Sequence, residues 1–140
     1  MSVYVVDASI AAKWFLNESH AGEACLVLHS GHELHAPDFL LLEMDSLLAK
    51  HVRRGNIVSK DAADIRNALR RFDISYHSFP PLLDDTYELA DAIRQSPYDC
   101  LYVVLAILIR GRMVTADRKL YDALARTLLC EHVLWVEDLQ

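Results

Sequence analysis

Four acidic residues stand where carboxylates could do chemistry together. Asp7 follows the apolar run at residues 3–6, and Asp117 follows the run at residues 113–116. Asp99 lies at the start of a predicted helix, and Glu43 lies one to two turns into another. In open α/β sheets, ligands bind beyond the carboxyl ends of the strands. We therefore expect the four carboxylates to converge at one edge of a sheet.

Such a cluster of acids needs protons or a cation to be stable. Two like charges about 4 Å apart repel by about 4 kcal/mol at an effective dielectric constant of about 20. Three close carboxylates would repel by about 12 kcal/mol, which is comparable to the whole stability of a domain. Oxygen ligands without histidine or cysteine favour Mg²⁺ or Mn²⁺. The pattern therefore indicates a metal that could activate a water and neutralise charge on a phosphodiester.

Each acid, taken alone, also has an ordinary structural explanation. An Asp between a strand and a helix is a common helix N-cap, which would account for Asp7 and Asp117. Ser96 and Asp99 have the spacing of a capping box, and Glu43 could be a solvated helix residue. Asp99 and Glu43 are nevertheless flanked by apolar residues, and a charge in apolar surroundings is costly unless it has a partner. That observation favours a joint site.

The elements that must position these acids alternate between strand-like and helix-like segments. Strand-like runs occupy residues 3–6, 34–36, 74–79, 113–116 and 133–136. Helix-like segments occupy residues 8–16, 19–30, 38–54, 59–71, 84–95, 98–109 and 118–129. This alternation predicts a mainly parallel sheet with helices on both faces. We expect one domain over residues 1–140, a three-layer α/β/α sandwich, with a helical hairpin inserted where residues 38–71 form two consecutive helices.

The composition narrows the class of protein. The chain has 140 residues, of which 53% are hydrophobic and 24% charged, so it can bury a full core. Its three cysteines form no CxxC pair and its start lacks a signal-peptide pattern, which predicts a reduced cytoplasmic protein. The longest strictly apolar run, residues 101–109, is too short for a membrane span. The net charge of −6 argues against coating nucleic acid by charge alone.

The four acids fall within four short motifs in a fixed order. These are VVDAS at residues 5–9, APDFLLLE at residues 36–43, SPYDCLYV at residues 96–103 and VTADRKL at residues 114–120. Together, over essentially the whole chain, they resemble the PIN-domain family, and most closely its VapC-type toxins. The resemblance implies a PIN-like α/β/α sandwich. It also implies an Mg²⁺- or Mn²⁺-dependent endoribonuclease that acts as the toxin of a type II toxin–antitoxin pair.

The same resemblance assigns roles to residues. The family's acidic site is matched by Asp7, Glu43, Asp99 and Asp117. Of these, Asp7, Asp99 and Asp117 would hold the metal, and Glu43 would complete the site or orient the attacking water. Ser9 and Thr115 match positions whose hydroxyl groups support the acids. One departure is Ser46, where the family often has asparagine.

Positive charge gathers in one segment of this acidic chain. Residues 50–71 contain seven Lys or Arg against two Asp, a net charge of +5. The predicted hairpin would carry four arginines that could contact RNA phosphates, namely Arg53, Arg54, Arg66 and Arg70. The alternative is a solvated helix face, with Arg53 and Arg54 complementing a helix C-terminus.

Partners are also implied by the resemblance: an RNA substrate, a small cognate antitoxin that inhibits the enzyme, and a second copy of the chain. The sequence adds one argument for a homodimer. Trp14, Phe15 and Leu16 are large apolar residues on a short predicted helix, and one small domain is not expected to cover them fully.

Three other functions stay open at the level of sequence. A PIN-type nuclease could process RNA outside any toxin pair. A PIN-like domain without activity could only bind a partner protein, although four intact acids argue against this. A receiver domain of a signalling protein also has an acidic Mg²⁺ pocket, but Asp7 stands alone after its strand and Lys119 falls inside a helix start. The histidines at 29, 32 and 35 lack the HExxH spacing of a zinc site.

Overall fold

A parallel sheet of five strands forms the centre of the computed structural model, which describes residues 2–139. The strands are β1 (Val3–Val6), β2 (Glu33–Pro37), β3 (Ile74–His77), β4 (Arg112–Thr115) and β5 (Val133–Trp135). Their order across the sheet is β3-β2-β1-β4-β5, and every neighbouring pair is parallel. The strand order therefore reverses between β1 and β4. In open α/β sheets, ligands bind at the carboxyl ends beside such a switch point.

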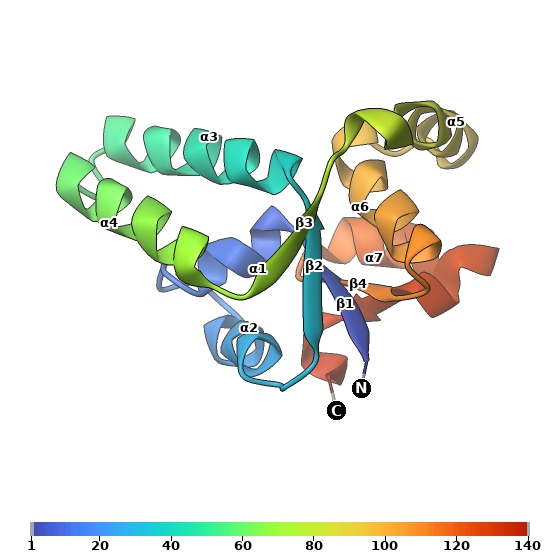
Figure 1. The fold of residues 1–140 in the computed structure, drawn as a ribbon, viewed down its shortest axis with the longest axis horizontal. Helices are drawn as coiled ribbons and strands as arrows, with labels where there is room; N and C mark the ends of the chain where they lie inside the picture. Colours follow the sequence, from blue (N-terminus) through green and yellow to red (C-terminus); the bar gives the residue numbers. More distant parts are fainter. Residues whose placement is uncertain (1, 140) are drawn as a thin grey trace.

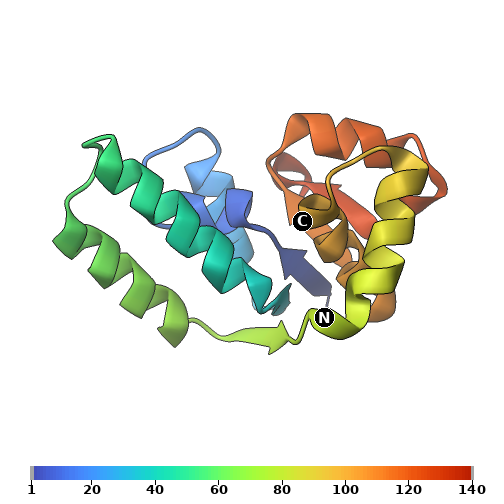
Figure 2. The same ribbon diagram turned by 90° about the horizontal axis from the view of Figure 1, so that it is seen from above.

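Helices cover both faces of the sheet, as Figures 1 and 2 show. One face carries α1 (Ala8–Lys13), α2 (Ala21–Leu28), α3 (Phe39–Arg53) and α4 (Ser59–Arg71). The other carries α5 (Leu83–Ile93), α6 (Pro97–Leu108) and α7 (Arg118–Ala125). Short 3-10 turns lie at Pro80–Leu82, Leu128–His132 and Val136–Asp138. These layers confirm the predicted α/β/α sandwich with its central parallel sheet.

Helix α6 is the apolar centre of its layer. Its residues 100–106 are all buried, and it packs against β1, β2 and β4. Pro97 opens the helix, where its missing N–H costs nothing, and the Ser96 hydroxyl accepts from the Tyr98 N–H at 3.2 Å. This confirms the predicted helix start and places Asp99 in the first turn. Neither α6 nor any other helix within residues 2–139 is long and apolar enough to cross a membrane.

Helices α3 and α4 form a hairpin that extends away from the sheet, as both views show. Gly55 follows α3 with a φ of +76°, a left-handed conformation that glycine adopts readily at a helix C-terminus. The Arg66 guanidinium of α4 joins the two helices by donating to both carboxylate oxygens of Asp45 on α3, at 2.6 and 3.1 Å. The structure thus confirms the predicted hairpin insertion.

Two helices end several residues earlier than the sequence predicts. The helix expected over residues 8–16 ends at Lys13, and the helix expected over residues 118–129 ends at Ala125. Just beyond Ala125, the Thr127 hydroxyl donates to the Leu124 carbonyl at 2.7 Å and accepts from the Leu129 N–H at 3.0 Å. A hydroxyl that bonds the backbone in this way competes with the helix, so the chain continues as a 3-10 turn.

The hairpin covers the aromatic residues that follow α1. The ring centroid of Phe72, at the end of α4, lies 5.5 Å from that of Trp14 and 5.4 Å from that of Phe15. The Trp14 indole N–H also donates to the Ala24 carbonyl at 2.8 Å. Trp14, Phe15 and Leu16 all pack against the core. All three nevertheless stay partly exposed, so the domain does not cover them fully, as the sequence predicts.

Candidate active site

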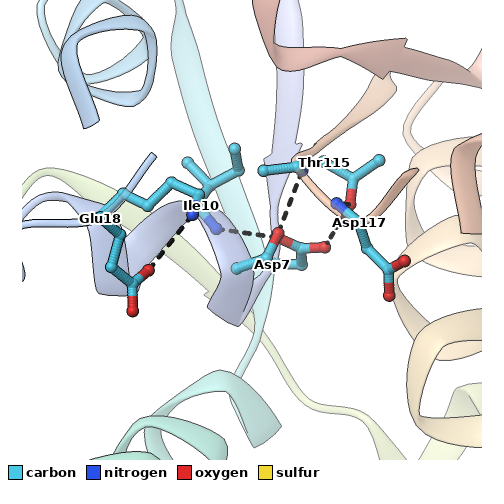
Figure 3. A network of polar contacts seen from close by, with 8 residues as sticks. Asp7, Ile10, Glu18, Thr115 and Asp117 are labelled. Atoms are coloured by element: carbon cyan, nitrogen blue, oxygen red, sulfur yellow. Dashed lines mark hydrogen bonds and ion pairs between the residues drawn. The ribbon is translucent and has the colours of Figure 1, made fainter. Parts of the chain in front are cut away.

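Two of the four acids lie within two residues of the ends of the central strands, at the switch point. Asp7 follows β1 and is the N-cap of α1, and Asp117 follows β4 and is the N-cap of α7. Asp7 accepts from the Ile10 N–H at 3.1 Å, and Asp117 accepts from the Leu120 N–H at 3.2 Å. Figure 3 shows both acids beside Thr115, the last residue of β4. Capping thus holds each acid at the same edge of the sheet.

Hydroxyl groups hold the Asp7 carboxylate in place. Asp7 is 6% exposed, and its two oxygens accept from the Ser9 hydroxyl at 2.6 Å and from the Thr115 hydroxyl at 2.9 Å. Thr115 in turn accepts from the Asp117 N–H at 3.1 Å, and Ser9 accepts from the Ala116 N–H at 3.2 Å. Both hydroxyl residues singled out in the sequence therefore contact Asp7. They also tie it to the segment that carries Asp117.

The surroundings of Asp7 disfavour its negative charge. Burial raises its pKa from 3.8 to about 6, because a buried carboxylate loses its solvation by water. The hydrogen bonds from Ser9, Thr115 and Ile10 oppose this shift, and the charge of Asp99 adds to it. None of the ion pairs within residues 2–139 involves Asp7. The ionised form would therefore gain from a cation bound nearby.

Asp99 reaches the same edge from α6, on the other face of the sheet. It is half-buried, and burial and the charge of Asp117 raise its pKa. Asp99 and the exposed Asp117 line a hollow of about 320 Å³ that Arg94 and Lys119 also border. The capping-box explanation fails, because no hydrogen bond within the described chain joins the Asp99 side chain to Ser96. Sequence reasoning did not assign Arg94 or Lys119 to this site.

Glu43 extends from α3 and is held by a tyrosine that sequence reasoning missed. The buried hydroxyl of Tyr102, on α6, donates to a Glu43 carboxylate oxygen. Burial raises the pKa of Glu43, the Tyr102 hydrogen bond opposes this, and the charges of Asp7 and Asp99 add to it. Tyr102 lies three residues after Asp99, so both side chains lie on one side of α6. The sequence did offer one indication of this role: Tyr102 places a hydroxyl group one turn from Asp99, within an otherwise apolar helix.

The four carboxylates form a loose cluster with the chemistry of a site for a hard cation. The charge of Asp99 acts on Asp7 and Glu43, and the charge of Asp117 acts on Asp99. No three His, Cys, Asp or Glu side chains within residues 2–139 already lie at the spacing of a metal cage. The donors that converge are carboxylate oxygens, which suit Mg²⁺ or Mn²⁺. The donor set therefore fits such an ion, and the four elements bring these donors to one open edge.

The arginines predicted to contact RNA differ in their surroundings. Arg53 and Arg54 are exposed at the end of α3. Arg66 is engaged by Asp45, and Arg70 donates to the Arg66 carbonyl at 3.2 Å. Arg66 thus has a structural partner that would compete with phosphate.

Comparison with known proteins places the chain in a family. The sequence pattern of the PIN domain matches residues 4–125. The chain is 34% identical to Ribonuclease VapC3 of Pyrobaculum aerophilum over 120 residues, which cover 84% of this chain and 92% of that protein. It is 30% identical to VapC ribonuclease Mb0985 of Mycobacterium bovis over 118 residues, which cover 84% of this chain and 88% of the relative.

Solved structures share the fold. The crystal structure of PAE2754 from Pyrobaculum aerophilum superposes with a TM-score of 0.71 at 24% identity, covering 97% of this chain and 85% of that one. VapBC2 from Rickettsia felis, solved bound to a DNA fragment from its promoter, superposes with a TM-score of 0.62 at 14% identity. The match covers 86% of this chain and 92% of that one. PIN membership excludes the receiver-domain alternative. From its sequence pattern, its relatives and its fold, this chain belongs to the PIN-domain family.

Proposed function

We propose that this protein is an Mg²⁺- or Mn²⁺-dependent endoribonuclease. The observation that carries the proposal is the convergence of Asp7, Asp99 and Asp117, with Glu43 beside them, at the switch point of the sheet. The ribonuclease names of relatives that match most of the chain support the same reaction.

Each residue contributes differently to this proposed site. Asp7, Asp99 and Asp117 would hold the cation, and Glu43, which accepts a hydrogen bond from Tyr102, would take a proton from the attacking water. When bound, the cation supplies charge neutralisation for the phosphodiester and a more acidic water. Ser9 and Thr115 keep both Asp7 oxygens turned to fixed positions.

The substrate is a single RNA strand that must approach an acidic edge. Arg53, Arg54, Arg66 and Arg70 on the hairpin are the phosphate contacts we propose, because a charge of +5 over residues 50–71 offsets repulsion by the acids. Their exposure on α3 and α4 supports this.

We propose that the enzyme is the toxin of a type II pair and that a small antitoxin inhibits it. The VapC names of the relatives support this over a role in RNA processing. Three free cysteines, Cys25, Cys100 and Cys130, fit a reducing compartment such as the cytoplasm. Growth arrest on expression, relieved by co-expression of the product of an adjacent small reading frame, is the expected result. Unaffected growth would favour the processing alternative.

We also propose a homodimer, with a surface on α5 and α6 as its interface. The neighbouring helices α5 and α6 carry exposed apolar side chains, among them Leu83, Tyr87 and Leu108. Such a group is typical of a protein interface. Light scattering should give twice the 15.9 kDa chain mass, and Tyr87→Lys with Leu108→Lys should give one chain mass. Leu128→Lys, at an even more exposed leucine elsewhere, should leave the dimer intact.

Cleavage of RNA under controlled metal tests the proposed reaction. Wild-type protein should cleave a mixed single-stranded RNA with Mn²⁺ and should stop when EDTA is added. Asp99→Asn should lose at least about a hundredfold in rate, in line with the loss of a charge-stabilising group in an active site. Asp84→Asn, an exposed acid on α5, is the matched control and should cleave normally. Full activity in EDTA or in Asp99→Asn would contradict the proposal.

A further inference from the structure

A second cavity opens at the amino ends of the strands, opposite the acidic edge. Its volume is about 830 Å³, within the range of small-molecule sites. It is bordered by the starts of β1 and β4 and by residues near β2 and β5, including Ser2, Tyr4, His32, Arg110, Arg112 and Asp138. Asp7 and Asp117 lie at the other ends of β1 and β4, so this cavity is separate from the site described above.

Two arginines border the cavity from a backbone that is fixed in place. Arg110 adopts a left-handed φ of +57° between α6 and β4. The next residue, Gly111, packs so closely that an added Cβ would lie 2.6 Å from the Val3 carbonyl oxygen. Within residues 2–139, neither Arg110 nor Arg112 has an ion-pair partner or a side-chain hydrogen bond. Two exposed guanidinium groups thus border the cavity with no acceptor among the described residues.

A histidine adds a third donor. The Ser2 N–H donates to His32 Nδ1 at 3.0 Å, so the neutral ring carries its proton on Nε2. The His32 ring packs edge-on against Tyr4, with centroids 5.2 Å apart, which limits its orientation. The Asp138 carboxylate, also on the cavity wall, can accept a hydrogen bond from a hydroxyl group but not from an ionised phosphate oxygen, which has no proton to donate.

This donor set points to a phosphate ester with a sugar attached. Guanidinium groups bind phosphate through paired N–H donors, and an imidazole N–H can add one more bond. A carboxylate beside them suits a ribose hydroxyl. We propose that the cavity binds a nucleotide through its phosphate, either a free nucleoside monophosphate or the 5′-phosphorylated end of an RNA strand. The site is distinct from the catalytic acids and does not depend on cleavage.

Binding to the full chain in metal-free buffer with EDTA tests this site. The probes are AMP, inorganic phosphate, and one RNA hexamer with either a 5′-phosphate or a 5′-hydroxyl, each titrated by calorimetry. AMP or the 5′-phosphorylated hexamer should bind more tightly than inorganic phosphate and the 5′-hydroxyl hexamer. Which of the two binds identifies the source of the phosphate.

Substitutions locate the binding. Arg110→Gln and Arg112→Gln should each weaken it roughly tenfold or more, as expected for a charged hydrogen bond. Arg126→Gln, an exposed arginine at the end of α7, is the control and should not change it. RNA cleavage should persist in all three variants, and equal melting temperatures would show intact folds. Binding unchanged in both Arg110→Gln and Arg112→Gln would overturn the proposal. So would affinities for AMP and for the 5′-phosphorylated hexamer that both fail to exceed the affinity for inorganic phosphate.

Discussion

One Asp7 oxygen caps helix α1 while the other accepts from Thr115, so this carboxylate serves local structure and the acidic cluster together. Asp117 likewise caps α7, through the oxygen that accepts from the Leu120 N–H, and also belongs to the acidic cluster. An ordinary cap and a functional acid are therefore not alternatives at these positions. Capping fixes the side chain at a helix N-terminus, where the helix dipole partly stabilises its charge.

The raised pKa of Asp7 predicts how stability depends on pH without metal. Its folded-state pKa of about 6 exceeds 3.8, so the folded protein binds this proton more tightly than the unfolded chain. Below about pH 4, Asp7 contributes its full stabilisation to the folded protein. This contribution, at most about 3 kcal/mol, should be lost as the pH rises through about 6.

Asp7→Asn removes this titration. Thermal melts from pH 4 to about 7.5 in EDTA should show a flatter profile and a higher melting temperature at neutral pH. The gain in stability at neutral pH should stay below about 3 kcal/mol. In this variant an amide nitrogen faces the Thr115 hydroxyl, where a carboxylate oxygen accepted its hydrogen bond in the wild type. Asp84→Asn should keep the wild-type profile. A melting temperature at pH 7 that falls in Asp7→Asn would contradict this electrostatic account.

Tyr102→Phe tests whether the tyrosine positions Glu43. The hydroxyl lowers the pKa of Glu43, so its loss should raise that pKa and move the acid limb of the pH–rate profile to higher pH. Stability should fall by about 1–2 kcal/mol, because a buried hydrogen bond is lost. Tyr98→Phe, exposed on the same helix, is the control. A purely structural role for Tyr102 would lower the melting temperature and leave the pH–rate profile in place.

Among the elements, the α3–α4 hairpin connects the acidic edge to the basic segment. The first half of α3 carries Glu43, and its last turn is rich in basic residues. Asp45 binds Arg66 of α4, so the orientation of the two helices depends on a residue next to the site. If the hairpin binds RNA, its helices would lead the strand toward Glu43.

Arg66→Gln with Arg70→Gln tests the hairpin as an RNA surface. RNA binding should weaken, and its dependence on salt should flatten by about one unit of slope per lost phosphate contact. Lys60→Gln is a suitable control, because Lys60 is also exposed on α4 and paired with an acid, Asp64. An unchanged slope in the double variant would show that the basic hairpin is a solvated surface.

At the scale of the molecule, the features that could be predicted from the sequence are those that depend on neighbouring residues. Short apolar strands alternating with helices, and single acids at the strand ends, were sufficient to predict the parallel sheet and the convergence of Asp7 and Asp117. Ser96 and Pro97 fixed the start of α6 and with it Asp99. Each of these signals lies within a few neighbouring residues.

Long-range packing accounts for what the sequence did not reveal. The Tyr102–Glu43 hydrogen bond joins residues 59 positions apart, and the stacking of Phe72 on Phe15 joins two separate elements. The early end of α7 depends on a single hydroxyl, that of Thr127, which helix periodicity does not register. The cavity beside Arg110 exists only because the starts of β1 and β4 are neighbours.

Direct binding of Mn²⁺ tests the central claim, that carboxylates from separate elements together hold a divalent cation. At about one hundred times its dissociation constant, Mn²⁺ should stabilise the wild-type protein by about 2.7 kcal/mol, or roughly 5–10 °C in melting temperature. Asp7→Asn and Asp99→Asn should each lose most of this shift, while Asp84→Asn keeps it. An Mn²⁺-induced shift that is equal in the wild type and in both Asp7→Asn and Asp99→Asn would contradict the account.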